Sequence, residues 1–193
     1  MPTNLRQAVA IVAAANAAYF GIEFLVALKI GSVSLFADSI DFLEDASVNL
    51  LILLALNWSA RARARVGMVL AAILLAPAAA TAWTAWQKLM TPVPPAVLPM
   101  TLTGLGALIV NLSCAFVLAR FRHHAGSLSR AAFLSARNDA LANVAIMIAA
   151  GITVLYPSSW PDLVVGIGIA ILNADAAREV FEAARSEHRA AEP

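Results

Sequence analysis

The feature that most constrains this chain is a group of acidic side chains inside a segment too apolar to lie anywhere but in a membrane. Asp41 and Asp45 are one helical turn apart in an otherwise hydrophobic run, residues 33–56. A carboxylate near the centre of a bilayer costs several kcal/mol unless it is compensated, so such residues usually mark an ion or proton pathway. Further oxygen-bearing residues share this helix face at about 100° per residue: Ser34, Asp38 and Asn49. A column of oxygen ligands suits a divalent cation.

The composition of the whole chain supports a membrane location. The 193 residues are 61% hydrophobic and 13% charged, and the mean hydropathy is +0.80. An ordinary soluble domain is about 45–50% apolar and about 25% charged. The sequence therefore predicts an integral membrane protein.

Six segments are long and apolar enough to be transmembrane helices, which need roughly 20 residues each. The connections between them carry charges or turn-forming residues. The expected spans are residues 8–28, 33–56, 66–88, 97–120, 131–156 and 160–181. We therefore expect an all-α integral membrane protein, a six-transmembrane-helix bundle that forms a single transmembrane domain over residues 1–193.

The basic residues predict the orientation of this bundle. With both termini on one side, that side holds all eleven arginines, and the other side holds only Lys29 and Lys88. Positively charged loops remain in the cytoplasm. We therefore expect a multi-pass protein of the cell membrane with cytoplasmic N- and C-termini.

A second polar face, in the fifth expected span, repeats the spacing of the first. Ser135, Asp139 and Asn143 follow one another at intervals of four residues, the interval between Asp41 and Asp45. At about 1.5 Å per residue, Asp45 and Asp139 lie roughly 16 Å and 12 Å from the inner ends of their helices, so they are able to face each other. Three carboxylates meeting at this depth repel one another unless a divalent cation or protons neutralise them. The sequence therefore predicts a metal site.

A purely structural role for these aspartates is the main alternative. Intramembrane aspartates also cap helices or pair with arginine, but no arginine falls near the centre of an expected span. Arg137 lies close enough to the cytoplasmic end to extend out of the membrane. We therefore favour ion ligation by Asp41, Asp45 and Asp139.

Other polar residues leave two interpretations open. Asp38 is expected either on an outer ion path or in a helix–helix bond, and the same holds for Glu23, which shares a face with Asn16 and Tyr19. The loop residues His123 and His124 are candidates for cytoplasmic metal delivery, or simply solvated. Single roles are expected for three others: a contact with a neighbouring helix for Glu44, an interhelical hydrogen bond for Asn111, and a favourable helix-dipole charge for Asp162.

These residues resemble the cation diffusion facilitator family of divalent-metal/proton antiporters. The similarity covers nearly the whole chain, and the matching features are Glu23, Gly31-Ser32, Ala37-Asp38, Asp41-x-x-x-Asp45, Trp86-Gln-Lys with Pro92 and Pro94, Val110-Asn111, the basic-histidine loop, Asn138-Asp139-Ala140-Leu141 and Pro161-Asp162-Leu163. The resemblance implies six transmembrane helices and a tetrahedral metal site shared by the second and fifth. It also implies loading from the cytosol and outward release as protons bind the vacated ligands.

The chain departs from the family pattern in two respects. Ser135 replaces the first of the two usual fifth-helix ligands, so the site becomes all-oxygen, with Asn143, or less favourably Asn138, as another candidate for the missing ligand. Without imidazole, the preference shifts from zinc toward manganese, iron or cobalt. Only about a dozen residues follow the sixth span, where the family generally carries a cytoplasmic metal-sensing domain. We therefore expect no soluble C-terminal domain, and any homodimer would form through the membrane part.

The sequence thus favours a secondary transporter that exports a divalent transition metal in exchange for protons, with the lipid bilayer as its surroundings, no cofactor and no nucleic-acid partner. A non-transporting accessory membrane protein is one alternative. A metal-dependent intramembrane enzyme is less favoured, because the Asp-Gly-x-x-Ala-Arg motif of CDP-alcohol phosphotransferases and the Gly-x-Gly-Asp motif of intramembrane aspartyl proteases are missing.

Overall fold

The computed structural model describes the backbone of residues 3–55, 59–119 and 126–190; the side chains of residues 3–5 and 126–137, and of most positions in 60–78 and 176–190, are outside the description. The described residues form six helices and no strand. The helices are α1 (Thr3–Ile30), α2 (Val33–Ala55), α3 (Ala60–Met90), α4 (Val97–Ala119), α5 (Gly126–Leu155) and α6 (Trp160–Ala190). Over its described residues, each of the six expected spans corresponds to one helix, which confirms the all-α bundle, and α3 and α6 extend well beyond their expected spans.

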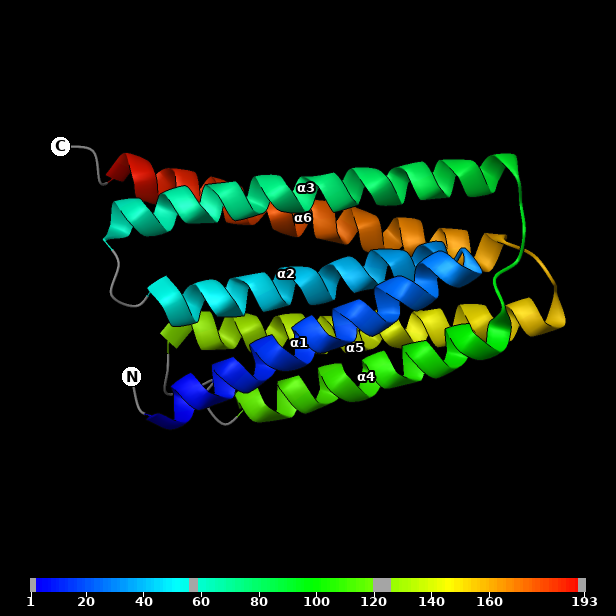
Figure 1. Cartoon of the computed structure of the whole chain (residues 1–193), viewed down its shortest axis with the longest axis horizontal. Helices are drawn as coiled ribbons and strands as arrows, with labels where there is room; N and C mark the ends of the chain where they lie inside the picture. The colour runs from blue at the N-terminus through cyan, green and yellow to red at the C-terminus, as the bar shows by residue number, and fades with distance from the viewer. Residues whose placement is uncertain (1–2, 56–58, 120–125, 191–193) are drawn as a thin grey trace.

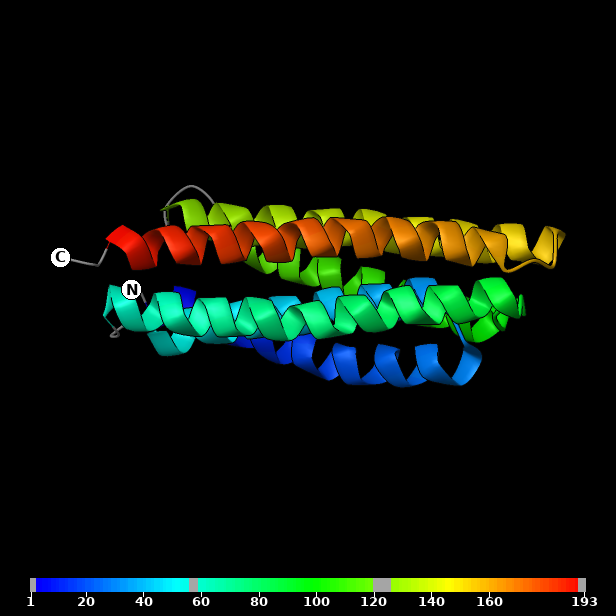
Figure 2. The ribbon, with the colours of Figure 1, turned by 90° about the horizontal axis from the view of Figure 1, so that it is seen from above.

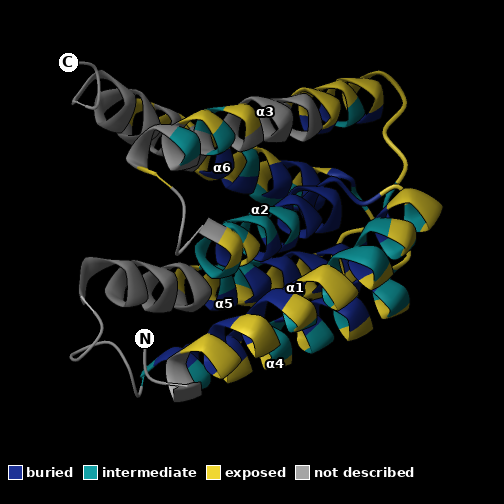
Figure 3. Ribbon diagram, turned by 60° about the vertical axis from the view of Figure 1, so that its left-hand side comes forward, coloured by how far each residue is buried: buried dark blue, intermediate teal, exposed yellow. Residues whose placement is uncertain are grey.

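Polarity is distributed as expected for a protein surrounded by lipid. Large apolar side chains such as Leu25, Leu98 and Leu155 are exposed on the outside, at 67%, 70% and 75%, while α2 is largely buried in the interior (Figure 3). Within the described residues, three helical segments are long and apolar enough to cross a membrane: Arg6–Ile30, Val97–Ala119 and Asn138–Leu155. The 23-residue α2 is long enough to span, but the acids in its middle lower its hydropathy.

Two groups of helices make up the bundle. Helices α3 and α6 run alongside each other on one side, and α1, α2, α4 and α5 make up the rest (Figures 1 and 2). Helix α2 contacts all five of the others. Because the number of helices is even, α1 begins at the same end of the bundle at which α6 finishes (Figure 1). The acids of α2 can therefore meet side chains from every part of the molecule.

A buried charge cluster fixes the opposite end of the bundle. Gly31, with φ of 64°, permits the sharp reversal from α1 into α2. Asp162, in the first turn of α6, accepts hydrogen bonds from the first backbone N–H groups of α2, those of Val33 (2.9 Å) and Ser34 (3.1 Å). Its carboxylate also accepts the Ser32 and Ser34 hydroxyls, at 2.7 and 2.6 Å.

Lys88 completes this cluster from α3. Its ammonium lies 3.0 Å from the Asp162 carboxylate and also donates to the carbonyl of Gly31. Asp162 does lie in the first turn of its own helix, as the sequence indicated. However, it also caps α2 and pairs with α3, so one carboxylate joins the α3–α6 pair to the start of the acid-bearing helix.

Candidate metal centre

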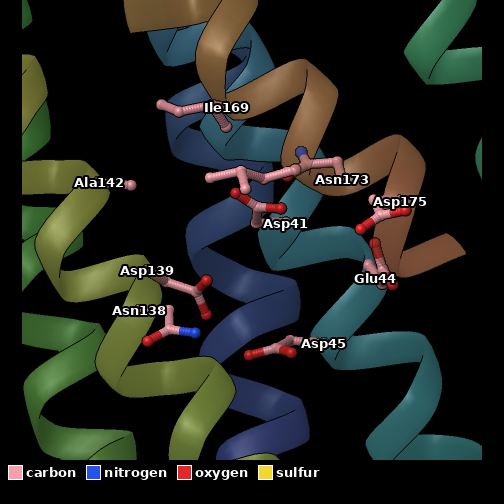
Figure 4. Close-up of a pocket in the computed structure, with 10 residues that line it drawn as sticks. Asp41, Glu44, Asp45, Asn138, Asp139, Ala142, Ile169, Asn173 and Asp175 are labelled. Atoms are coloured by element: carbon pink, nitrogen blue, oxygen red, sulfur yellow. The ribbon is translucent and has the colours of Figure 1, made fainter. Parts of the chain in front are cut away.

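A cavity of about 240 Å³ lies between α2, α5 and α6, about halfway along the bundle. Its lining includes Asp41 and Asp45 from α2 and Asp139 from α5, all three half-buried. In the close-up, both α2 carboxylates project toward the side of the cavity that α5 forms (Figure 4). The structure therefore brings together, around one space, the three aspartates that the sequence singled out.

The helical repeat explains how α2 supplies two of these groups. Residues four apart lie on the same face, one turn above the other, so Asp41 and Asp45 both face the cavity. The residues that follow each of them, Phe42 and Ala46, are buried. Asp41 lies in the electrostatic field of Asp139 and of the other acids on its own helix, so negative charge accumulates at this point.

Helix α6 adds polar groups that the sequence reasoning missed. Asn173 and Asp175 line the cavity, and Glu44 of α2 lies on the same side as Asp175 (Figure 4). The Asn173 side chain donates to the backbone carbonyl of Ala37 at 3.1 Å, whereas Asp175 is exposed. Their only sequence signal is a pair of polar residues interrupting the apolar run near the inner end of the sixth span.

The Asp45 carboxylate is oriented by a residue of α1. The amide of Asn16, which is fully buried, donates to Asp45 at 3.3 Å. The Asn16 oxygen in turn accepts the Cys114 thiol of α4 at 3.7 Å. A buried amide held at both ends restricts the rotamers that Asp45 adopts.

The acidic groups surround the cavity rather than converge on one point. Within the described residues, no three acidic, histidine or cysteine side chains are close enough together to hold a metal ion as they stand. The cavity is thus an acid-lined chamber, in which the side chains of α2 and α5 must rotate inward to surround an ion.

Asn143 is placed elsewhere than the sequence suggested. It is fully buried, its amide donates to Asp38 of α2, and its oxygen accepts from Asn111 of α4 at 3.1 Å. The interhelical hydrogen bond expected for Asn111 is therefore confirmed. Asn143 is not among the residues that line the cavity, and its hydrogen bonds leave it poorly placed to complete a metal site.

The family comparison then identifies the chain. The family model for the cation efflux transmembrane domain matches residues 9–187. The chain belongs to this family, the cation diffusion facilitators that its sequence resembles. A search of curated proteins gives no match.

Membership in the cation efflux family establishes the general activity. Its members are membrane transporters of divalent metal cations and not enzymes, so the chain is a metal cation transporter and the metal is its cargo. Among the other candidate residues, the side chain of Ser135 lies outside the described part of α5, and His123 and His124 lie in the undescribed segment 120–125. Glu23 and Asp38 are fully buried and are not among the residues that line the cavity.

Proposed function

We propose that this cation efflux protein exports a divalent transition metal from the cytosol in exchange for protons, with Asp41, Asp45 and Asp139 as the transported ion's ligands. The observation that carries the proposal is that these carboxylates, from two helices, line one chamber inside a membrane bundle. Like charges at this depth repel, and a divalent cation or bound protons relieve the repulsion. Metal and protons therefore compete for the same oxygens.

The proposed direction of transport rests on access to the chamber. The lining residues Asn138 and Asp175 are exposed, and Asp45 is one helical turn closer than Asp41 to the end of the bundle that carries the termini. The arginine distribution makes this the cytoplasmic end of a protein in the cell membrane. An ion entering from the cytosol would meet Asp45 and Asn138 first and Asp41 afterwards.

The ligand chemistry favours hard or borderline ions. The described polar residues of the chamber offer carboxylate and amide groups, a set that suits manganese, iron or cobalt at least as well as zinc. Side chains from α6, above all Asn173, are better placed than Asn143 to assist the three aspartates.

Transport by the purified protein in liposomes tests the proposal. Vesicles loaded with a metal-sensitive dye should report entry of Mn²⁺, Fe²⁺, Co²⁺ or Zn²⁺, and a pH-sensitive dye should report counterflow of protons. Asp45→Ala and Asp139→Ala should abolish both signals, whereas Glu182→Gln, which removes an exposed carboxylate at the end of α6, should keep them. Absence of metal entry for every ion in the wild type would favour the accessory-protein alternative.

A further inference from the structure

A second pair of acids lies in the interior, apart from the metal chamber. Glu23 of α1 and Asp38 of α2 are both fully buried, and neither lines the chamber. Their carboxyl groups lie within hydrogen-bonding reach of each other. Asp38 is one turn from Asp41 toward the outer end of α2, so this dyad lies between the chamber and the Asp162 cluster.

Most of the dyad's oxygens have no hydrogen-bond donor. Among the described residues, none donates to either oxygen of Glu23 or to Oδ1 of Asp38. Asp38 Oδ2 receives the amide of Asn143, whose own oxygen is already bonded to Asn111. A buried acceptor without a donor costs about 1–3 kcal/mol, and more when it is charged. Three such oxygens in one place favour the binding of a proton or a cation there.

The described polar groups around the dyad donate no hydrogen bond to these three oxygens. Tyr19 of α1 is near both acids, but its hydroxyl donates to the Thr103 carbonyl of α4 at 2.6 Å. Asp41 of α2 adds negative charge. The other neighbouring helices contribute amides that are already bonded: Asn111 from α4, Asn143 from α5 and Asn173 from α6.

A single proton satisfies two of these three oxygens, because it is bonded to one of them and hydrogen-bonded to another, and it removes one of the two negative charges. Two facing carboxylates in a low-dielectric interior do not both ionise, and one shared proton converts their repulsion into a hydrogen bond. Both acids are fully buried, and Asp41, which interacts with each of them, links their charge to the metal chamber. Metal arriving at Asp41 would cancel negative charge there and change the affinity of the dyad for its proton.

We propose that Glu23 and Asp38 form a proton-binding site distinct from the metal chamber, which holds one proton between the two carboxyl groups and exchanges it during the transport cycle. The proposal rests on the proposed function, because it adds a second proton site, besides the metal ligands themselves, to the exchange that this function requires. It makes the dyad a coupling site and not a ligand of the transported metal.

Comparing two modes of transport tests this assignment. Metal–metal exchange between equal pH values needs no net proton movement, whereas accumulation driven by a pH gradient does. With Mn²⁺, Co²⁺ and Zn²⁺ as probes, Glu23→Gln and Asp38→Asn should reduce gradient-driven accumulation at least about tenfold, the scale of a coupling free energy between two sites, and reduce exchange far less. Glu182→Gln serves as the matched control and should change neither mode.

Infrared difference spectroscopy provides a readout independent of transport. The wild type should show the C=O band of a protonated carboxyl group, and Glu23→Gln should lose it while metal binding by calorimetry persists. The proton-binding role would be wrong if the variants lost exchange and accumulation equally, which would indicate a structural role. It would also be wrong if Glu23→Gln lost its affinity for metal, which would indicate a metal-ligating role. Unchanged coupling in both variants would also overturn the proton-binding role. A wild type without metal exchange would instead contradict the proposed function.

Discussion

Asn16 carries no charge and lies on a different helix from the acids of the chamber, yet it orients the side chain of one of them, Asp45. Its amide donates to Asp45 and its oxygen accepts from Cys114. Removing an outer partner of a metal ligand, the role that we propose for Asp45, typically costs about 10–100-fold in metal affinity. Asn16→Ala should therefore weaken metal binding, measured by calorimetry, by about tenfold or more.

Cys114→Ala provides the control for this prediction. It removes only the weak thiol donor at the far end of Asn16 and leaves the bond to Asp45 intact. We expect nearly wild-type affinity from this variant. If Asn16→Ala folds and binds metal as the wild type does, Asp45 is not oriented by this amide.

Competition between metal and protons gives a second prediction for single residues. If Asp41, Asp45 and Asp139 bind the metal as proposed, their carboxylates must be ionised to do so, and the metal affinity should fall as the pH falls. The loss should be about tenfold per pH unit for each proton that the metal displaces. Asp139→Asn removes one exchangeable proton and should give a shallower slope, measured by titrating the metal at several pH values. A slope that does not differ between wild type and variant would exclude Asp139 from the site.

The sequence predicted the aspartates of the chamber better than their neighbours. Asp41, Asp45 and Asp139 stand out because a four-residue spacing and a similar depth can be read directly from the chain. Asn143 has the same spacing from Asp139, but its partner Asp38 depends on how α2 and α5 are rotated, which periodicity does not specify. Asp175 lies near the inner end of the expected sixth span, where charged residues are common and give no signal.

At the scale of helices, contact between α6 and the start of α2 depends on Gly166. A Cβ atom there would lie 2.7 Å from the Ser34 nitrogen and the Val33 carbonyl carbon, backbone atoms that have little freedom to move. Gly166→Ala should push α6 away from α2 and lower the thermal unfolding temperature in detergent.

Gly168→Ala is a matched control on the same helix. A Cβ at Gly168 meets nothing within 4 Å, and replacing glycine by alanine within a helix gains about 0.5–1 kcal/mol. This variant should be as stable as the wild type or more so. Equal destabilisation by both substitutions would show that close packing of α6 on α2 is not the cause.

The link between the α3–α6 pair and α2 depends on the charges of Lys88 and Asp162. Lys88→Met leaves the buried Asp162 carboxylate without its cation, and removal of one partner from a buried pair typically costs about 3–5 kcal/mol. Unfolding of the variant in detergent should show a loss of this order. Arg178→Met breaks the exposed pair with Glu182 and should have no measurable effect. Equal stability of Lys88→Met and wild type would show that the hydroxyl and N–H donors alone satisfy Asp162.

The number of helices was predictable because apolar length is a property of each segment by itself. The ends of the helices were less predictable, because α3 and α6 continue past the expected spans through charged residues that are compatible with a helix in water. Which helices pair was not predictable. The contact of Lys88 with Asp162 joins residues 74 positions apart, and neither residue indicates the other in the sequence.

For the whole molecule, the distribution of charge predicts how the bundle is inserted. Arginines occur at the end that carries the termini, and the opposite end holds Lys29 and the buried Lys88. On a Cys114→Ala background, which removes the one cysteine, a membrane-impermeant maleimide should label Thr91→Cys in intact cells, because Thr91 is exposed between α3 and α4. Glu182→Cys should react only after the cells are opened, because the arginine-rich end remains in the cytoplasm. The reverse pattern would place the mouth of the acidic chamber outside the cell and turn the proposed export into uptake.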